Sequence, residues 1–162
     1  MRIGIIADTH NDQNLTQRAL ARLQQESIGT ILHAGDVTSA RLLQLFEGYD
    51  VWIARGNMDH DPALIPTAQA LFGPGRLKAV HTLSLNGCNI AMVHNGESPS
   101  ARELIKTKAY TYLIHGHTHH IRDERMLSTR IINPGAIGNT RWRRPSFAIL
   151  DLGTDDLSII EL

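Results

Sequence analysis

The chain has 162 residues, of which 42% are apolar and 20% charged, and its 16 lysines and arginines balance 16 aspartates and glutamates to a formal net charge of +0. These values predict one globular domain over residues 1–162, and they give no support for binding to bulk nucleic acid or to an anionic membrane. The single cysteine, Cys88, excludes an internal disulfide and a multi-cysteine zinc site, favours the reducing cytoplasm, and is itself expected to be buried and inert.

The first third of the chain alternates between predicted strands and helices. Its opening apolar run is too short for a signal peptide or a membrane span, so neither is expected there. Short branched apolar runs predict buried strands over residues 2–7, 30–35 and 50–56. Between them, helical spacing of apolar residues predicts helices over 13–26 and 38–48. This order is typical of a parallel α/β sheet.

The remainder of the chain is mainly strand. The Asn86-Gly87 pair is a strong two-residue hairpin signal and predicts a strand on each side of it, within residues 76–96. Further strands are expected over residues 110–116, 125–133, 146–152 and 157–162. The simplest assembly is two layers of mixed sheet with flanking helices.

One further helix is predicted over residues 98–109. Ser100 and Glu103 have the spacing of a capping box, and Pro99 suits the first turn. No repeat, low-complexity segment or linker indicates a domain boundary in the chain.

Polar side chains follow five of the predicted strands. In open α/β sheets, ligands bind beyond the carboxyl ends of the strands, so the residues at these ends are the candidates for chemistry. The five groups are Asp8-Thr9-His10, Gly35-Asp36, Gly56-Asn57-Met58-Asp59, His94-Asn95-Gly96 and Gly116-His117-Thr118-His119. Four histidines fall within residues 115–120. If they were a chance cluster or a purification tag, polar residues would not be expected to recur at the ends of four other strands.

Seven of these side chains carry oxygen or nitrogen ligands suited to metal ions. They are Asp8, His10, Asp36, Asn57, His94, His117 and His119. Asp8 and His10 are two residues apart, so extended backbone would point both to the same side, and the same holds for His117 and His119. Seven ligands exceed the needs of one tetrahedral ion and suit two divalent ions that share a bridging carboxylate.

The ordered motifs DTH, GD, GNMD, HNG and GHTH resemble those of the calcineurin-like metallophosphoesterase superfamily, in particular its small single-domain phosphodiesterase branch. The segment NPGAIG (133–138) resembles the Asn-Pro-Gly loop of that branch, and the resemblance covers the chain from Asp8 to about residue 150. It implies an α/β fold in the form of a four-layer αββα sandwich, with two mixed β-sheets flanked by helices.

The resemblance also implies a ligand set and a reaction. One metal ion would take Asp8, His10, His119 and the shared Asp36, and the other would take Asp36, Asn57, His94 and His117. A hydroxide bridging the two divalent metal ions would attack a phosphodiester in line. The mixed ligands favour manganese, and iron, nickel, cobalt or zinc are also compatible.

Several nearby residues have two readings. Larger relatives often place a histidine proton donor after the asparagine, and here that position is Met58, which cannot donate. Asp59 would either cap a turn or orient a ligand. Arg141, in the basic run RWRR, would either be solvated or bind phosphate, and Trp142 beside it could stack on a ring. Among the remaining histidines, His120 is the first candidate to reach the site, and the others, including His33, are expected to be ordinary polar residues.

Three functions remain open from the sequence. They are a phosphodiesterase acting on a small phosphodiester, a phosphomonoesterase, and a non-catalytic scaffold like the retromer subunit of this fold. Two divalent ions, two carboxylates and a hydroxide leave about one positive charge, which a diester monoanion neutralises and a monoester dianion exceeds. The presence of ligating side chains at all seven positions favours catalysis. The oligomeric state and the physiological substrate stay open.

Overall fold

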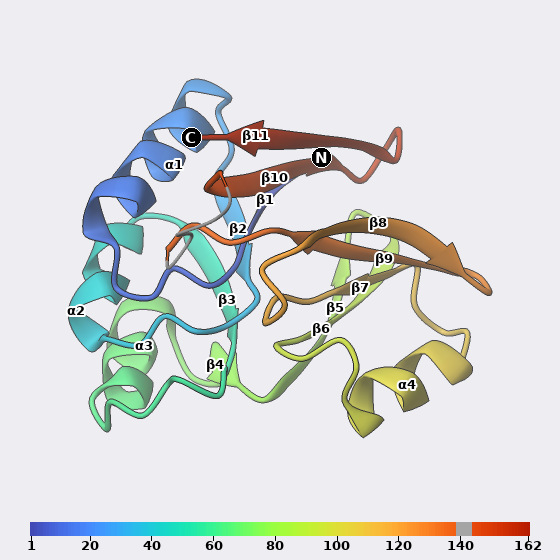
Figure 1. Cartoon of the computed structure of the whole chain (residues 1–162), viewed down its shortest axis with the longest axis horizontal. Helices are drawn as coiled ribbons and strands as arrows, with labels where there is room; N and C mark the ends of the chain where they lie inside the picture. Colours follow the sequence, from blue (N-terminus) through green and yellow to red (C-terminus); the bar gives the residue numbers. More distant parts are fainter. Residues whose placement is uncertain (139–143) are drawn as a thin grey trace.

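Two mixed β-sheets lie face to face, and helices cover both outer faces (Figure 1). The structure is a computed structural model, and it describes residues 1–138 and 144–162. The predicted α/β class and the four-layer αββα sandwich are confirmed.

The first sheet has six strands in the order β11-β10-β1-β2-β3-β4. Strands β1 to β4 are parallel to one another, whereas β10 is antiparallel to both β1 and β11. The strands span Arg2–Ile6 (β1), Thr30–His33 (β2), Asp50–Ala54 (β3), Leu77–Lys78 (β4), Ser146–Asp151 (β10) and Asp156–Glu161 (β11). The parallel strands bring the carboxyl ends of β1, β2 and β3 to one edge.

The second sheet has five strands in the order β5-β6-β7-β9-β8, of which β6, β7 and β9 are parallel. The strands span Val80–Leu85 (β5), Cys88–Val93 (β6), Tyr112–Ile114 (β7), Ile121–Met126 (β8) and Thr129–Pro134 (β9). The predicted hairpin at Asn86-Gly87 joins β5 to β6. Both residues have positive φ, at 50° and 77°, as a two-residue hairpin turn requires.

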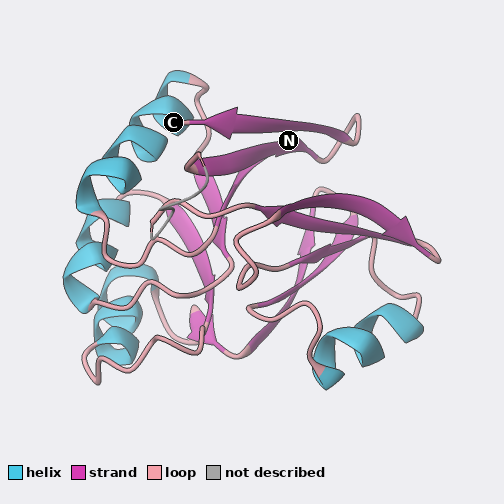
Figure 2. Ribbon diagram, viewed as in Figure 1, coloured by secondary structure: helices cyan, strands magenta, loops and turns pink. Residues whose placement is uncertain are grey.

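Helices are divided unequally between the two outer faces (Figure 2). The first sheet carries α1 (Gln13–Gln25), α2 (Ala40–Leu43), a following 3₁₀ turn (Gln44–Phe46) and α3 (Leu64–Phe72), and the second carries α4 (Pro99–Lys106). Helix α1 begins where the Asp12 carboxylate accepts the Leu15 N–H at 3.0 Å. Its buried face, which includes Leu23, packs against β1 at Gly4, where no side chain intervenes.

Three apolar layers separate the four structural layers. The alternation of side chains along β1 puts Ile5 between the sheets and Ile6 under the helices. On the far side, Val93 of β6 packs with Ala101 and Ile105 of α4. The central strands of each sheet are therefore buried on both faces, which explains why they are nearly continuous apolar runs.

The structure corrects several predicted elements. Helix α3 was not predicted, since Pro66 and the turn residues before it obscure a helix of only nine residues. The single strand expected before Asn86 divides into β4, in the first sheet, and β5, in the second. The strand predicted over 125–133 is the hairpin of β8 and β9, which turns at Leu127 with φ 57°.

Two smaller predictions were also wrong. Helix α4 begins at Ser98, whose hydroxyl accepts the Ala101 N–H at 3.2 Å, so Ser100 and Glu103 do not form the capping box, although Pro99 does occupy the first turn. Cys88 is half-buried rather than buried, and its thiol lies 3.6 Å from the Leu152 carbonyl oxygen.

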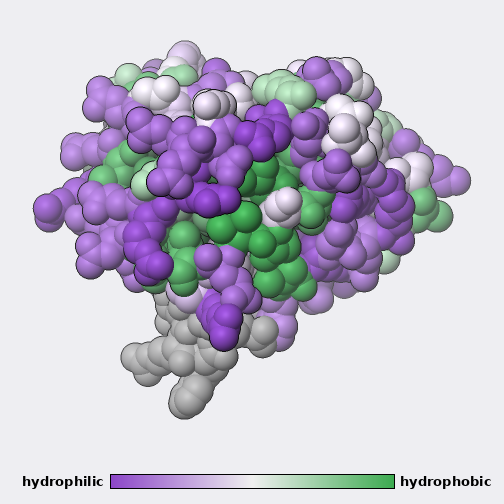
Figure 3. Space-filling view, turned by 90° about the horizontal axis from the view of Figure 1, so that it is seen from above, coloured by the Kyte–Doolittle hydropathy of each residue, from purple (hydrophilic) through white to green (hydrophobic). Residues whose placement is uncertain are grey.

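The surface of the described residues is mainly polar. Figure 3 looks down on the face that carries β11, where hydrophilic residues predominate around a central apolar patch. Within residues 1–138 and 144–162, no helix is both long and apolar enough to cross a membrane.

Candidate metal centre

The seven predicted ligand residues all follow strands that end at the same side of the two sheets. Strands β1, β2 and β3 lead to Asp8, His10, Asp36 and Asn57, and strands β6 and β7 lead to His94, His117 and His119. The sheets meet here through a hydrogen bond in which the His117 N–H donates to Oδ2 of Asp8 at 3.0 Å. The structure thus brings all seven side chains together.

The first group of side chains surrounds the Asp8 carboxylate. Nε2 of His10 and Nε2 of His119 lie 3.2 Å apart. These nitrogens lie 4.0 Å and 3.6 Å, respectively, from Oδ1 of Asp8. Asp8 is fully buried, whereas the two imidazoles are partly exposed. Their ligand atoms lie within 4.8 Å of one another, close enough to hold one metal ion.

The second group surrounds the side-chain oxygen of Asn57. This Oδ1 lies 2.9 Å from Nε2 of His94 and 3.0 Å from Nδ1 of His117. The two imidazole nitrogens are 3.3 Å apart.

Asp36 lies between the two groups. Its Oδ2 is 3.8 Å from Nε2 of His10 and 3.4 Å from Nε2 of His94. Its other oxygen, Oδ1, accepts the backbone N–H of Met58 at 2.8 Å. One oxygen is therefore held by the backbone and the other faces both groups.

Left-handed backbone, rather than extended backbone, aims most of these side chains. The φ angles are 52° at Asp8, 43° at His10, 57° at Asp36, 71° at His117 and 58° at His119. The extended geometry predicted for the two pairs of residues is therefore wrong. His117 and His119 in fact reach different groups. Such conformations cost of order 1–3 kcal/mol each and are typical of functional sites, where the surrounding fold imposes them.

Two glycines make room for the buried carboxylates. A Cβ atom at Gly56 would lie 2.1 Å from Oδ1 of Asp36, and one at Gly116 would lie 2.7 Å from Oδ2 of Asp8. Side chains at these positions would displace the carboxylates.

Asp59 connects the two loops that carry Asp36 and Asn57. Its buried carboxylate accepts the backbone N–H groups of Gly56 at 2.7 Å, Thr38 at 2.8 Å and Asp36 at 3.2 Å. Asp59 therefore fixes the backbone on both sides of the second group.

Two polar contacts that the sequence did not predict hold other ligand loops. The Asn133 amide donates to the Gly116 carbonyl at 2.9 Å and to the Thr118 hydroxyl at 3.1 Å, which fixes the loop between His117 and His119. Nε2 of the buried His33 lies 3.1 Å from the Thr9 hydroxyl, between Asp8 and His10. An asparagine before Pro-Gly was visible in the sequence, but its partner was not.

The carboxylates and imidazoles shift one another's pKa values. Burial opposes the charged form of Asp36, but hydrogen bonds from His94 and the Met58 N–H hold its pKa below the ordinary value. The Asp8 carboxylate raises the pKa of His119. Burial lowers the pKa of His10. The site is thus a compact array of interacting charges.

The tautomer of His94 is fixed by the fold. Its Nδ1 lies 2.8 Å from the Ala34 carbonyl oxygen, to which only a protonated nitrogen can donate. In the neutral ring, Nε2 then carries the lone pair and faces Asp36 and Asn57, as a metal ligand requires.

Comparison with known proteins places this arrangement in a family. The model of the calcineurin-like phosphoesterase superfamily domain matches residues 1–155. The chain belongs to this superfamily. The predicted resemblance is confirmed, and the family and its named relatives support a phosphoesterase, an enzyme of the hydrolase class.

Related proteins agree over nearly the whole chain. It is 25% identical over 154 residues to phosphodiesterase MJ0936 of Methanocaldococcus jannaschii, covering 93% of each chain. The solved structure of an archaeal phosphodiesterase superposes with a TM-score of 0.89 at 26% identity, covering 100% of both chains. Vps29 of Entamoeba histolytica superposes with a TM-score of 0.72 at 18% identity, covering 100% of this chain and 99% of its own, which shows a shared fold alone.

Of the remaining predicted residues, Met58 and His120 lie at the margins of the site. The Met58 side chain is 47% exposed at the rim. His120 is exposed and lines a pocket beside His119. Arg141 and Trp142 lie outside the described residues, whereas Arg144, at the end of the same basic run, pairs with Glu161 at 2.7 Å.

Proposed function

We propose that this chain is a phosphodiesterase that uses two divalent metal ions. The observation that carries the proposal is the position of Asp36, whose Oδ2 faces both His10 and His94 at 3.8 Å and 3.4 Å. A carboxylate oxygen shared between two ligand groups is the arrangement that a binuclear centre requires.

The residues fit the proposed ions. The first ion would be held by Asp8, His10, His119 and Asp36, and the second by Asp36, Asn57, His94 and His117. In both groups, oxygen and imidazole nitrogen atoms converge, and within residues 1–138 and 144–162 no contact of a lysine or arginine side chain with them is recorded. Such mixed donors suit manganese, with iron, nickel, cobalt or zinc also compatible. Divalent ions bound at these ligands supply Lewis acidity, which activates water and stabilises negative charge on phosphoryl oxygens.

The chain's own residues hold this constellation rigid. Asp59 fixes the loops of Asp36 and Asn57, while Asn133 fixes the loop of His117 and His119. A ligand set that is already in place does not need to be reorganised during the reaction, which favours stabilisation of the transition state. No side-chain proton donor stands at position 58, so departure of the leaving group depends on its own acidity or on another donor.

Pockets on both sides of the ligand set favour a diester over a monoester. One pocket, of about 390 Å³, adjoins Asn57, His94 and His117 of the second group. Another, of about 330 Å³, adjoins His119 of the first group. A phosphodiester has two ester arms, and each would find space beside the ligand group on its side, whereas a monoester would leave one pocket empty.

The scaffold alternative rests on the fold that the chain shares with Vps29. A scaffold has no need of seven ligand side chains that converge beside one another, nor of a buried carboxylate between them. The single domain and its one unpaired cysteine also fit an enzyme of the cytoplasm.

The test compares a diester with a monoester in protein loaded with each metal in turn. We expect bis(p-nitrophenyl) phosphate to be hydrolysed with a higher kcat/KM than p-nitrophenyl phosphate, and chelation to abolish both activities. Asp36→Asn should be inactive, while the exposed Lys106→Gln serves as the matched control. A fully loaded protein that hydrolyses neither substrate would favour the scaffold, and a preference for the monoester would favour a phosphomonoesterase.

A further inference from the structure

The pocket beside the second ligand group has a defined chemical character. One of its walls is the group itself, namely Asn57, His94 and His117. Its lining also includes Val80 at the start of β5 and Val93 at the end of β6, directly before His94. The ligand atoms and these two valines therefore belong to one continuous cavity.

The part of the lining formed by β5 and β6 is apolar. Val80 and Val93 are direct cross-strand partners in the antiparallel pair of β5 and β6, so their side chains lie next to each other. Ala79, immediately before β5, extends the same surface and is itself exposed. Such a surface gains free energy by excluding water from a ring or another apolar group.

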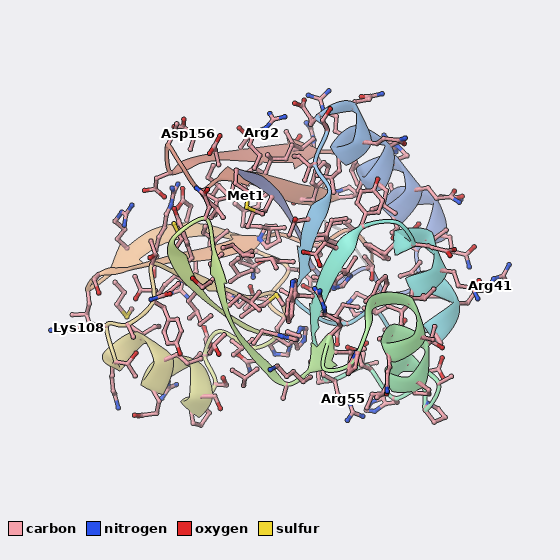
Figure 4. The ribbon with its side chains drawn as sticks, turned by 180° about the vertical axis from the view of Figure 1, so that it is seen from behind. Met1, Arg2, Arg41, Arg55, Lys108 and Asp156 are labelled. Carbon is pink, nitrogen blue, oxygen red and sulfur yellow. The ribbon has the colours of Figure 1, made fainter. Side chains whose placement is uncertain are left out.

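The charge of the pocket is positive. Among the described residues that line it, Arg55 is the one with a permanently charged side chain, and none is an aspartate or glutamate. The Arg55 guanidinium donates to the Asp59 carbonyl at 3.3 Å, which ties it to the loop of the second group. Figure 4 shows Arg55 at the lower edge of the molecule, opposite the edge where Met1 and Arg2 lie. Ser98 and Ser100 add hydroxyl groups from the start of α4.

We propose that this pocket binds one ester arm of the phosphodiester, and that the arm carries an aromatic ring with an anionic group at its far end. The inference rests on the proposed function and adds a substrate class to it. The ring would lie against Ala79, Val80 and Val93, and the anionic group would pair with Arg55. A volume of about 390 Å³ is in the range of small-molecule sites, so it admits a substituted ring.

The first experiment compares two diesters that release the same p-nitrophenolate. Phenyl p-nitrophenyl phosphate offers a ring as its second arm, and methyl p-nitrophenyl phosphate does not. We expect the phenyl diester to have a KM about tenfold lower in the native protein, because the ring is buried on binding. Ala79→Trp fills the pocket and should remove that advantage. Thr82→Trp, at an exposed position on β5 that does not line this pocket, is the matched control and should keep it.

A second experiment tests the anionic end. A carboxyphenyl p-nitrophenyl phosphate should have a lower KM than the phenyl diester in the native protein. Arg55→Ala should abolish this difference, and Arg55→Lys should restore part of it, because the lysine retains the charge. Equal effects of the two substitutions on all three diesters would show a structural role for Arg55 and overturn its assignment.

Binding without turnover provides an independent measurement. Methyl NMR signals of Val80 and Val93 should shift when the protein is titrated with phenyl phosphate and stay unchanged with methyl phosphate. Turnover with equal KM values and unshifted methyl signals would overturn the pocket assignment alone. Hydrolysis of neither diester by fully metal-loaded protein would overturn the proposed function, and this inference with it.

Discussion

Oδ2 of Asp36 lies 3.4 Å from Nε2 of His94, and the same oxygen faces the other ligand group through His10 at 3.8 Å. Asp36 is almost fully buried and its second oxygen is held by the Met58 N–H. The carboxylate therefore cannot rotate to serve one group alone, which makes it the residue on which both proposed metal sites depend.

We expect two metal ions per chain in fully loaded protein. Asp36→Asn removes the shared negative charge and should weaken binding of both ions, whereas His94→Ala should weaken mainly the second. Elemental analysis and calorimetric titration measure the stoichiometry. A saturation value of one ion in the native protein would contradict the binuclear assignment.

Asp59→Asn should weaken metal binding and activity by about 10–100-fold, the usual effect of losing a residue that orients ligands. The amide nitrogen would face backbone N–H groups that the carboxylate now accepts, at an estimated cost of about 1–3 kcal/mol in stability. Calorimetric metal titration and denaturant unfolding provide the two measurements.

Asp61→Asn is the matched control for Asp59. Asp61 also accepts two backbone N–H groups, from Ala40 at the start of α2 and from Ala63 just before α3, rather than from Asp36 or the residue before Asn57. The Asp61→Asn substitution should leave the metal affinity unchanged. Equal losses of metal affinity in the two variants would show that the effect of Asp59 is not specific to the site.

Activity should fall as the solution is acidified, because histidines must be neutral to bind metal and free histidine titrates near pH ~6.5. Since protons and metal compete for the same four imidazoles, the pH of half-maximal activity should move downward when the metal concentration is raised. Rate profiles at several metal concentrations test this. If the pH profile did not change with metal concentration, the loss of activity at low pH would have to come from another group.

Met58→His should raise turnover of alkyl phosphodiesters selectively. Aryl leaving groups need little protonation, whereas alkyl groups need a general acid, which typically contributes 10²–10⁴-fold. The Met58 side chain is exposed and its backbone N–H alone contacts Asp36, so the substitution should not disturb the ligands. Native rates that are already equal for alkyl and aryl diesters would show that another residue, with His120 or His60 as first candidates, supplies the proton.

Tyr112 should make stability sensitive to alkaline pH. Burial, and then the hydrogen bond of its hydroxyl to Asp155 at 2.9 Å, raise the pKa of Tyr112 to about 12 from an ordinary value of 10.0. Because the folded state holds this proton more tightly than the unfolded state, the stabilising contribution is complete below pH 10 and is lost as the pH rises from 10 to about 12.

Tyr112→Phe should therefore lose less stability than the native protein over that alkaline range. At neutral pH it should be less stable by about 1 kcal/mol, the net value of one hydrogen bond. Denaturant unfolding at pH 8, 10 and 11.5 tests both statements. Parallel curves for the two proteins across this range would show that Tyr112 does not contribute to the alkaline loss.

Local pattern in the sequence was sufficient to predict the identities of the candidate ligands. Buried parallel strands appear as short apolar runs, and their carboxyl ends must meet at one edge. Polar residues immediately after those runs, such as Asp8, Asp36 and Asn57, were therefore expected to lie close together. The superfamily was also predictable, because its motifs are short, ordered and local. Periodicity gave most of the strands for the same reason.

Tertiary structure alone decided how these residues are held. The backbone at Asp8 and His119 is left-handed, which no spacing rule predicts, since the packing of the two sheets and not local preference imposes it. The role of Asp59 depends on N–H groups more than twenty residues away at Asp36 and Thr38. The run before Asn86 likewise divides into β4 and β5 because each of these strands pairs at the edge of a different sheet. Periodicity indicates which face of a helix or strand is buried, but it does not indicate which other element covers that face. Contacts between distant segments are therefore decided only by the tertiary structure.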